Sequence, residues 1–120
     1  IRCTEPDEHS VRVAWQGENI YSLPIVMRFD SDGRPIATAD CYELCHVSTE
    51  KRDVLTECCS VLNERYRWVK FYLDEDQDVT AEADAVLNGE NAGLVATEIV
   101  QRMVGIVDEA YPKLMLARFN

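Results

Sequence analysis

The sequence lacks any apolar run long enough to span a bilayer, and it has no basic segment followed by an apolar stretch of the kind that directs secretion. It also lacks a glycine-rich phosphate loop, a nucleophile elbow and a paired-histidine zinc helix. These absences remove the usual sequence signs of membrane insertion, export, nucleotide binding and hydrolysis. We therefore predict a cytoplasmic protein that is not an enzyme.

Basic side chains are scarce relative to acidic ones. The 120 residues include 22 acidic and 12 basic side chains, which give a formal net charge of −10. Such a surface repels phosphate backbones and anionic lipids, so we expect neither a nucleic acid nor a membrane as partner. A neutral or basic protein surface fits this charge better.

The length and the hydrophobic fraction of 47% are those of one globular domain with one core. We expect residues 1–120 to form this single domain. Because the chain begins at Ile1 rather than at a methionine, a further helix could precede the first strand.

Five cysteines are an odd number, and the adjacent pair Cys58 and Cys59 rarely suits two separate disulfides. We interpret the cysteines as small hydrophobic residues in a reducing compartment. Cys41, Cys45 and His46 also have a spacing that zinc permits, with Cys58 and Cys59 as further candidate ligands. The residues between Cys41 and Cys45 follow a strand pattern rather than a zinc knuckle, so we predict core packing and no metal.

The stretch DEDQDVTAEAD, which begins at Asp74, is strongly acidic. Asp74, Asp76 and Asp78 alternate as in a calcium loop, but Val79 stands where that loop needs glycine and Ala85 where it needs glutamate. Strand patterns flank the stretch where an EF-hand has helices. We predict a solvated hairpin loop. The alternative is a metal- or ligand-responsive sensor that uses the cysteines or this loop.

Other candidates for chemistry are weaker. Glu82 and Asp84 share one face of a predicted strand and could form a carboxylate pair, with Lys70 as a cross-strand partner for one of them. A polar, solvated face is nevertheless the default for an antiparallel sheet. A cysteine paired with His9 or His46 has no supporting motif. We predict no catalytic, cofactor-binding or metal-binding residues.

The hydrophobic pattern has a period of two in five segments and the helical period in two longer ones. Strands are expected at residues 11–16, 25–30, 36–44, 67–73 and 79–87, with turns at 17–19 and 31–33. Helices are expected at 49–66 and about 91–111, where Pro112 ends or kinks the second helix. This order, β-β-β-α-β-β-α, predicts an α+β fold with helices flanking an antiparallel β-sheet.

The last predicted helix carries two neighbouring apolar stripes. One runs through Val95, Ile99, Met103, Ile106 and Ala110, and the other consists of Ala96, Val100, Val104 and Val107. Together they are wider than one contact with a sheet needs, and a monomer seldom exposes so much contiguous apolar surface. The second stripe therefore predicts a homodimer or partner surface, unless a preceding helix of the same chain covers it.

Four strings carry a family resemblance: IVMRFDSDGRPI, LNERYRWVKFYLDED, VTAEADAVL and RMVGIVDEAYP. They resemble bacterial YbjN-domain proteins, which are described as sensory-transduction regulators and are similar in fold to class I type III secretion chaperones. The positions that align most firmly are Asn63, Arg67, Asp84, Asp108, Tyr111 and Pro112.

The resemblance implies a helix-flanked antiparallel sheet, often in a dimer, with no established enzymatic activity and no cofactor. In the chaperones, helix and sheet surfaces bind extended segments of a partner protein. We therefore expect a chaperone-like, non-enzymatic protein-binding or regulatory module of bacterial type that acts as a homodimer.

Overall fold

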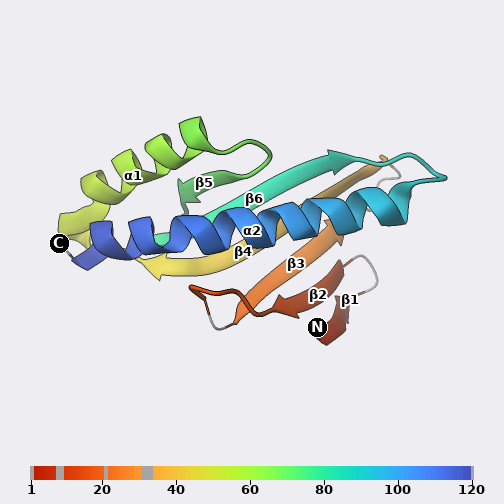
Figure 1. Ribbon diagram of the computed structural model, residues 1–120, viewed down its shortest axis with the longest axis horizontal. Helices are drawn as coiled ribbons and strands as arrows, with labels where there is room; N and C mark the ends of the chain where they lie inside the picture. Colours follow the sequence, from red (N-terminus) through yellow and green to blue (C-terminus); the bar gives the residue numbers. More distant parts are fainter. Residues whose placement is uncertain (1, 8–9, 21, 31–33, 120) are drawn as a thin grey trace.

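A computed structural model describes residues 2–7, 10–20, 22–30 and 34–119, with side chains from Ser10 onward. Six strands form one antiparallel sheet in the order β1-β2-β3-β4-β6-β5 (Figure 1). The elements are β1 (Arg2–Asp7), β2 (Ser10–Trp15), β3 (Leu23–Phe29), β4 (Ile36–His46), a 3-10 turn (Thr49–Lys51), α1 (Arg52–Arg65), β5 (Lys70–Leu73), β6 (Asp78–Val86) and α2 (Ala92–Phe119).

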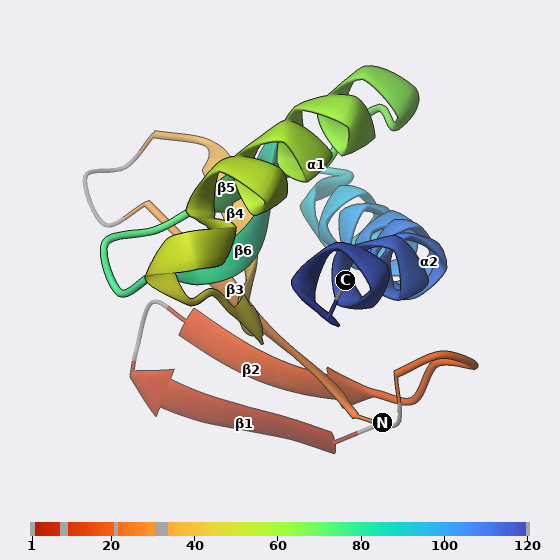
Figure 2. The same cartoon turned by 90° about the vertical axis from the view of Figure 1, so that its left-hand side faces the viewer.

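Both helices cover the same face of the sheet, which leaves the other face free of helices (Figures 1 and 2). Side chains alternate along each strand accordingly. The central strands β4 and β6 present alanines to the helices, and these alanines let α2 lie close to the sheet. The buried residues of the central strands on this face include Ala37, Ala39, Cys41, Cys45, Val79, Ala81 and Ala83.

The α+β class and the sheet flanked by helices are confirmed, but the predicted order lacked one strand. β1 pairs with β2 by backbone hydrogen bonds, so the order is β-β-β-β-α-β-β-α. Its sequence, RCTEPD, has no alternation of apolar residues that could have indicated a strand. The predicted turn at 31–33 lies outside the described residues, although β3 and β4 pair on either side of it.

α2 continues through Pro112 to Phe119, so the helix extends beyond the predicted range of about 91–111 and Pro112 does not end it. Proline has no N–H, so the carbonyl four residues earlier, that of Asp108, loses its helical partner. Asn19 supplies the missing donor, because its side-chain amide donates to the Asp108 carbonyl at 3.0 Å. The loop between β2 and β3 thus satisfies the oxygen that Pro112 leaves free.

The Asp108 carboxylate fixes the same loop. It accepts hydrogen bonds from the backbone N–H groups of Glu18, Asn19 and Ile20 at 3.1, 2.8 and 3.0 Å. Burial opposes ionisation of this carboxyl, but the three donors outweigh it and lower the pKa of Asp108. Gly17 is required beside it, because a Cβ atom there would lie 2.2 Å from the Asp108 carboxylate oxygen.

Asn63 joins α1 to the edge strand β5. Its side-chain oxygen accepts from the Phe71 N–H at 2.7 Å, and its amide donates to the Phe71 carbonyl at 3.0 Å. An amide side chain can make this two-way contact because it carries both a donor and an acceptor. The contact fixes the short connection between α1 and β5, which includes Tyr66 and Trp68.

We expect Asp108→Asn to lower the free energy of unfolding by about 1–3 kcal/mol, because charge-assisted hydrogen bonds to three N–H groups are weakened. Gly17→Ala should destabilise the protein by disturbing the same contact. Urea denaturation at neutral pH measures both effects, with the exposed Glu57→Gln on α1 as the control of equal charge. Because the folded-state pKa of Asp108 is lowered, its contribution should disappear as the pH falls below about 4. An unchanged unfolding midpoint for Asp108→Asn would contradict this assignment.

Candidate functional site

Two surfaces of the described chain are candidate sites, because each carries exposed or unpaired side chains that the packing of the core does not need. One is a groove beside α2, and the other is a carboxylate cluster on the helix-free sheet face.

The carboxylate cluster centres on Asp40 of β4 and Glu82 of β6, which are directly opposite each other in the strand register. The Arg28 guanidinium on β3 forms an ion pair with Asp40 Oδ2. The Tyr42 hydroxyl donates to the same oxygen at 3.1 Å, and the Tyr72 hydroxyl of β5 donates to Glu82 at 3.3 Å. Four adjacent strands therefore supply one polar cluster.

Asp40 is fully buried although it lies on the face without helices, and its second oxygen, Oδ1, has no hydrogen-bond donor. The hydrogen bond to Asp40, burial and the nearby negative charges of Asp40 and Asp84 raise the pKa of Glu82 to about 7. The pKa of Glu82 therefore lies well above the usual range of a glutamate.

The sequence offered Asp84 as a possible carboxylate partner of Glu82, but Glu82 lies opposite Asp40 of the neighbouring strand. Asp84 instead accepts a hydrogen bond from the Thr38 hydroxyl at 2.7 Å. Lys70 lies opposite Glu82 in the register, as expected, but no ion pair joins the two in the described part of the chain. Asp40 and Arg28 were not among the predicted site residues, because only the pairing of β3, β4 and β6 brings them together.

The acidic stretch after β5 forms the predicted hairpin loop between β5 and β6. Asp74 also stabilises this loop by hydrogen bonds. Its carboxylate accepts from the Asp76 and Asp78 N–H groups and from the Thr80 hydroxyl, at 2.9, 3.1 and 2.7 Å. Despite some burial, these donors lower the pKa of Asp74. The alternating acids therefore order a turn.

The cysteines do not gather into a ligand set. Burial raises the pKa of the thiols of Cys41 and Cys59 to about 12 and about 11, and it raises those of Cys45 and Cys58 as well. His46 points instead to Asp78, with 2.8 Å between its Nδ1 and the carboxylate. In residues 10–20, 22–30 and 34–119, no group of three or more His, Cys, Asp or Glu side chains is placed to hold a metal. His9 and the side chain of Cys3 lie outside the described residues.

The second surface, here called the α2 groove, runs along the first half of α2. It consists of two hollows, of about 800 and 330 Å³, that share Glu98 and Arg102 as lining residues. The first is lined by Tyr66, Leu94, Thr97, Glu98, Gln101, Arg102, Gly105, Ile106 and Glu109, and the second by Trp68, Asp84, Ala85, Val86, Val95, Glu98, Ile99 and Arg102. The groove lies between α2, the end of β6 and the connection from α1 to β5.

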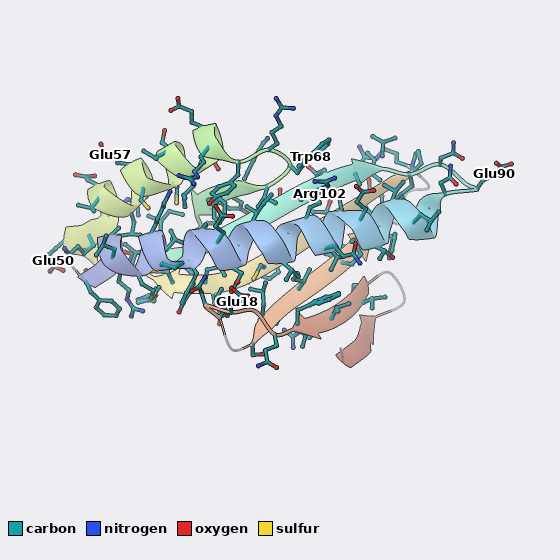
Figure 3. All side chains as sticks on the ribbon, viewed as in Figure 1. Glu18, Glu50, Glu57, Trp68, Glu90 and Arg102 are labelled. Carbon is teal, nitrogen blue, oxygen red and sulfur yellow. The ribbon has the colours of Figure 1, made fainter. Side chains whose placement is uncertain are left out.

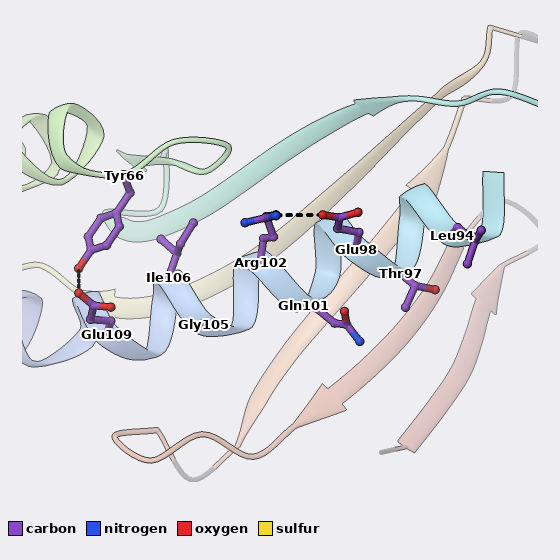
Figure 4. Close-up of a pocket in the computed structure, with 9 residues that line it drawn as sticks. All are labelled: Tyr66, Leu94, Thr97, Glu98, Gln101, Arg102, Gly105, Ile106 and Glu109. Carbon is purple, nitrogen blue, oxygen red and sulfur yellow. Dashed lines mark hydrogen bonds and ion pairs between the residues drawn. The ribbon is translucent and has the colours of Figure 1, made fainter. Parts of the chain in front are cut away.

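Polar contacts fix the walls of the α2 groove (Figure 4). The Tyr66 hydroxyl donates to Glu109 at 2.9 Å, and Arg102 forms an ion pair with Glu98 at 3.0 Å. The Arg102 guanidinium also lies 5.9 Å from the centre of the Trp68 ring, and Figure 3 shows the two side chains next to each other above α2. Trp68 has a φ of 76°, a left-handed backbone conformation that is unfavourable for a bulky residue.

The apolar stripe predicted as a dimer surface is largely part of the chain's own core. Val100 and Val107 are buried, and Ala96 and Val104 are half-buried against the core. Because α2 lies on both β4 and β6 and also contacts α1, it uses a wider apolar face than one sheet contact would require. Only Ala96 and Val104 keep part of their surface accessible.

Comparisons with known proteins identify the family of this chain. The family model described as "YbjN: Putative bacterial sensory transduction regulator" matches residues 5–114. The chain belongs to the YbjN family.

The YbjN domain is also similar in fold to a solved secretion-system protein. The match is to a chain in the structure of the heterodimeric complex ExoU-SpcU from the type III secretion system of Pseudomonas aeruginosa. It has a TM-score of 0.63 and 13% sequence identity, and it covers 99% of this chain and 90% of the other. This confirms the predicted chaperone-like fold. The comparison with curated proteins found no match.

The structure assigns contacts to three of the six positions that aligned best with the YbjN family. Asn63 binds the edge strand, Asp84 binds Thr38, and Asp108 binds the loop between β2 and β3. Pro112 has no N–H to donate, and this leaves the Asp108 carbonyl free to accept from Asn19.

In the ranges that the structure describes, no helix is long and apolar enough to cross a membrane.

The raised pKa of Glu82 predicts a pH dependence of stability. Folding raises the pKa of Glu82 from 4.5 to about 7, so the folded state binds the proton more tightly than the unfolded chain. Stability from this group is therefore complete below pH 4.5 and is lost as the pH rises from 4.5 to 7.

We expect Glu82→Gln to remove this loss, because the amide stays neutral over the whole range. Urea midpoints of the wild type and the variant across this pH range measure the difference. Glu57→Gln serves as the control of equal charge and should keep the wild-type slope. Parallel pH profiles for the wild type and Glu82→Gln would contradict the raised pKa of Glu82.

Proposed function

We propose that this YbjN domain is a non-enzymatic protein-binding module that holds a segment of a partner protein in the α2 groove. The observation that supports this proposal most strongly is the exposure and backbone conformation of Trp68. Its side chain is 60% exposed, lines the groove and is attached to backbone in a strained left-handed conformation.

The strain at Trp68 supports a binding role. A bulky residue at positive φ costs of order 1–3 kcal/mol, and glycine would avoid this cost. Burial of the ring in the domain's own core does not offset this backbone cost, because most of the side chain is exposed. An exposed aromatic residue next to an arginine is instead the kind of group that contributes strongly to protein interfaces.

The rest of the α2 groove indicates the chemistry of the partner segment. Leu94, at 74% exposure, adds an apolar contact at the start of α2. Glu98, Glu109 and Asp84 outnumber the one arginine in the lining. A segment with an apolar anchor and basic side chains fits this combination, and it also fits the net charge of −10.

The comparisons support a protein ligand. The chain of similar fold comes from a complex of two different proteins. A chaperone-like role in the bacterial cytoplasm is consistent with this likeness. The alternative of a sensor that uses the cysteines or the acidic loop gains no support, because neither forms a ligand set among the described side chains.

Trp68→Gly separates binding from folding. We expect the variant to be as stable as the wild type, or more stable by up to about 1 kcal/mol, because glycine tolerates the left-handed conformation. Binding of the partner should nevertheless fall at least tenfold, because the aromatic anchor is lost. Partners are recovered on immobilised full-length protein, identified by mass spectrometry and then titrated in purified form.

Phe119→Ala is the matched control for this experiment. Phe119 is also an exposed aromatic residue stacked against an arginine, Arg118, but it lies at the far end of α2. Its removal should leave binding unchanged. Equal loss of binding in both variants, or no loss in Trp68→Gly, would count against the α2 groove as the binding surface.

We also propose a homodimer, for which Ala96 and Val104 provide the remaining accessible part of the predicted stripe. Light scattering across a concentration series should give twice the chain mass of 13.7 kDa. Ala96→Glu should shift the mass towards the monomer, because a buried charge without a partner is costly. A monomer mass at all concentrations would exclude the dimer.

A further inference from the structure

We propose that two copies of this chain pair through the outer side of α2, with the two helices antiparallel and in contact at Gly105. The proposal rests on the homodimer proposed above, and it places the contact on a line of α2 next to Val104. In Figure 1, α2 lies over the sheet with its outer side uncovered. The exposed residues along this side, here called the outer ridge, are Leu94, Glu98, Gln101, Gly105, Glu109 and Leu116.

The first argument is Gly105, because no contact in the described part of the chain requires a glycine at this position. Gly105 lies in the interior of α2 on its exposed side, and a Cβ atom there would have no neighbouring group within 4 Å. Glycine in a helix interior is less stable than alanine would be. A glycine is useful where another backbone approaches closely. A second helix that contacts α2 at this point would use that property.

The second argument is the shape of the surface around Gly105, which lines a hollow on each side of α2. The first hollow of the α2 groove extends from Gly105 towards Tyr66. Another hollow, of about 500 Å³, extends towards the loop between β2 and β3 and is lined by Gln16, Gly17, Glu18, Val104, Gly105 and Asp108. The side chains of a neighbouring helix pack into such depressions on either side of the contact.

The third argument is the symmetric position of two exposed leucines. Leu94 lies eleven residues before Gly105 and Leu116 lies eleven residues after it, which is about three helical turns in each direction. The two side chains are 74% and 64% exposed. In a nearly antiparallel pair centred on Gly105, Leu94 of one copy therefore lies level with Leu116 of the other. Each end of the contact then buries two leucines that are exposed in the single chain.

The fourth argument is charge. α2 has no net charge, although the whole chain carries −10, because its charged side chains are Glu98, Asp108, Glu109, Arg102, Lys113 and Arg118. Two copies of α2 can therefore approach without the repulsion expected between other parts of this acidic surface. The antiparallel order also brings Glu109 of one copy beside Arg102 of the other. A parallel order would place Glu98 against Glu98 and Glu109 against Glu109, which is unfavourable.

The hollow at Trp68 stays accessible in this dimer. Its walls include residues 84–86 at the end of β6, so it lies to the side of α2 that faces this strand. The second copy would instead cover the first hollow between Gln101 and Glu109. A partner segment bound at Trp68 would then lie next to the second copy.

The first test is Gly105→Gln, with the dimer measured by sedimentation equilibrium of the purified chain. We expect the dissociation constant of the dimer to rise by roughly tenfold or more, because the longer side chain keeps the two helices apart. At a concentration where both proteins are monomers, the urea midpoint of the variant should equal or exceed that of the wild type, since glutamine favours a helix more than glycine does. A weaker dimer together with an equally stable fold excludes misfolding as the cause.

Gly93→Gln is the matched control. Gly93 also lies in α2 with open space around its Cβ position, but it is not on the outer ridge. The same substitution there should leave the dissociation constant of the dimer unchanged.

The second test determines the direction of the helices. Leu94→Glu and Leu116→Lys should each weaken their own homodimer, because each places a charge against a leucine of the other copy. A mixture of the two variants should form a heterodimer more tightly than either variant pairs with itself. One end of that heterodimer keeps its two leucines and the other gains an ion pair. Native mass spectrometry separates the three species by mass.

A wild-type dimer that Gly105→Gln leaves unchanged, or a mixture of the two leucine variants that stays monomeric, would overturn the outer ridge as the contact. If Ala96→Glu alone weakened the dimer, the homodimer would stand and this contact would be wrong. A wild-type monomer at all concentrations would overturn both. The experiments need no partner protein, so their failure leaves the binding role of Trp68 untouched.

Discussion

The Asp108 carboxylate makes the contact on which the arrangement of this fold depends. It accepts hydrogen bonds from three consecutive N–H groups of the loop between β2 and β3, and so attaches one half of the sheet to α2. The strands β1 and β2 lie at the edge of the sheet, and this charged contact adds to the packing of Trp15 against the core. At the other edge of the sheet, the Asn63 side chain attaches β5 to α1 by two hydrogen bonds to the backbone of Phe71. Two polar side chains thus connect the helices to the loop between β2 and β3 and to the edge strand β5, in addition to the apolar core between helices and sheet.

These two contacts explain how the domain presents two different surfaces. Since both helices cover one face, α2 and the connection after α1 meet above the end of β6 and form the α2 groove. The opposite face has no helix to bury apolar residues, and its central position is occupied by Asp40. One surface carries the exposed Trp68 in a left-handed backbone conformation beside several carboxylates, while the other buries the carboxylate of Asp40.

Much of the architecture could be predicted from the sequence, because alternation in β3, β4 and β6 and the helical period in α1 and α2 are strong signals. β1 could not, since its pairing depends on backbone hydrogen bonds. The pair of Asp40 and Glu82 could not be predicted for a similar reason. Alternation along one strand places Glu82 with Asp84, whereas the register between β4 and β6 places Glu82 opposite Asp40, and the irregularity between Cys41 and Cys45 shifts that register. The left-handed backbone of Trp68 also follows from tertiary structure and has no sequence signal.

Pro112 has a consequence for how the chain can vary. The proline removes a donor from α2, and Asn19, far away in the sequence, provides the replacement. The role of Asn19 is understood only together with Pro112, and Pro112 is tolerated only together with a donor such as Asn19. A helix without the proline would satisfy the Asp108 carbonyl internally, and Asn19 would then lose its acceptor. The two positions are therefore expected to show epistasis: the effect of changing one depends on the identity of the other, and a double-mutant cycle would give a coupling energy that differs from zero.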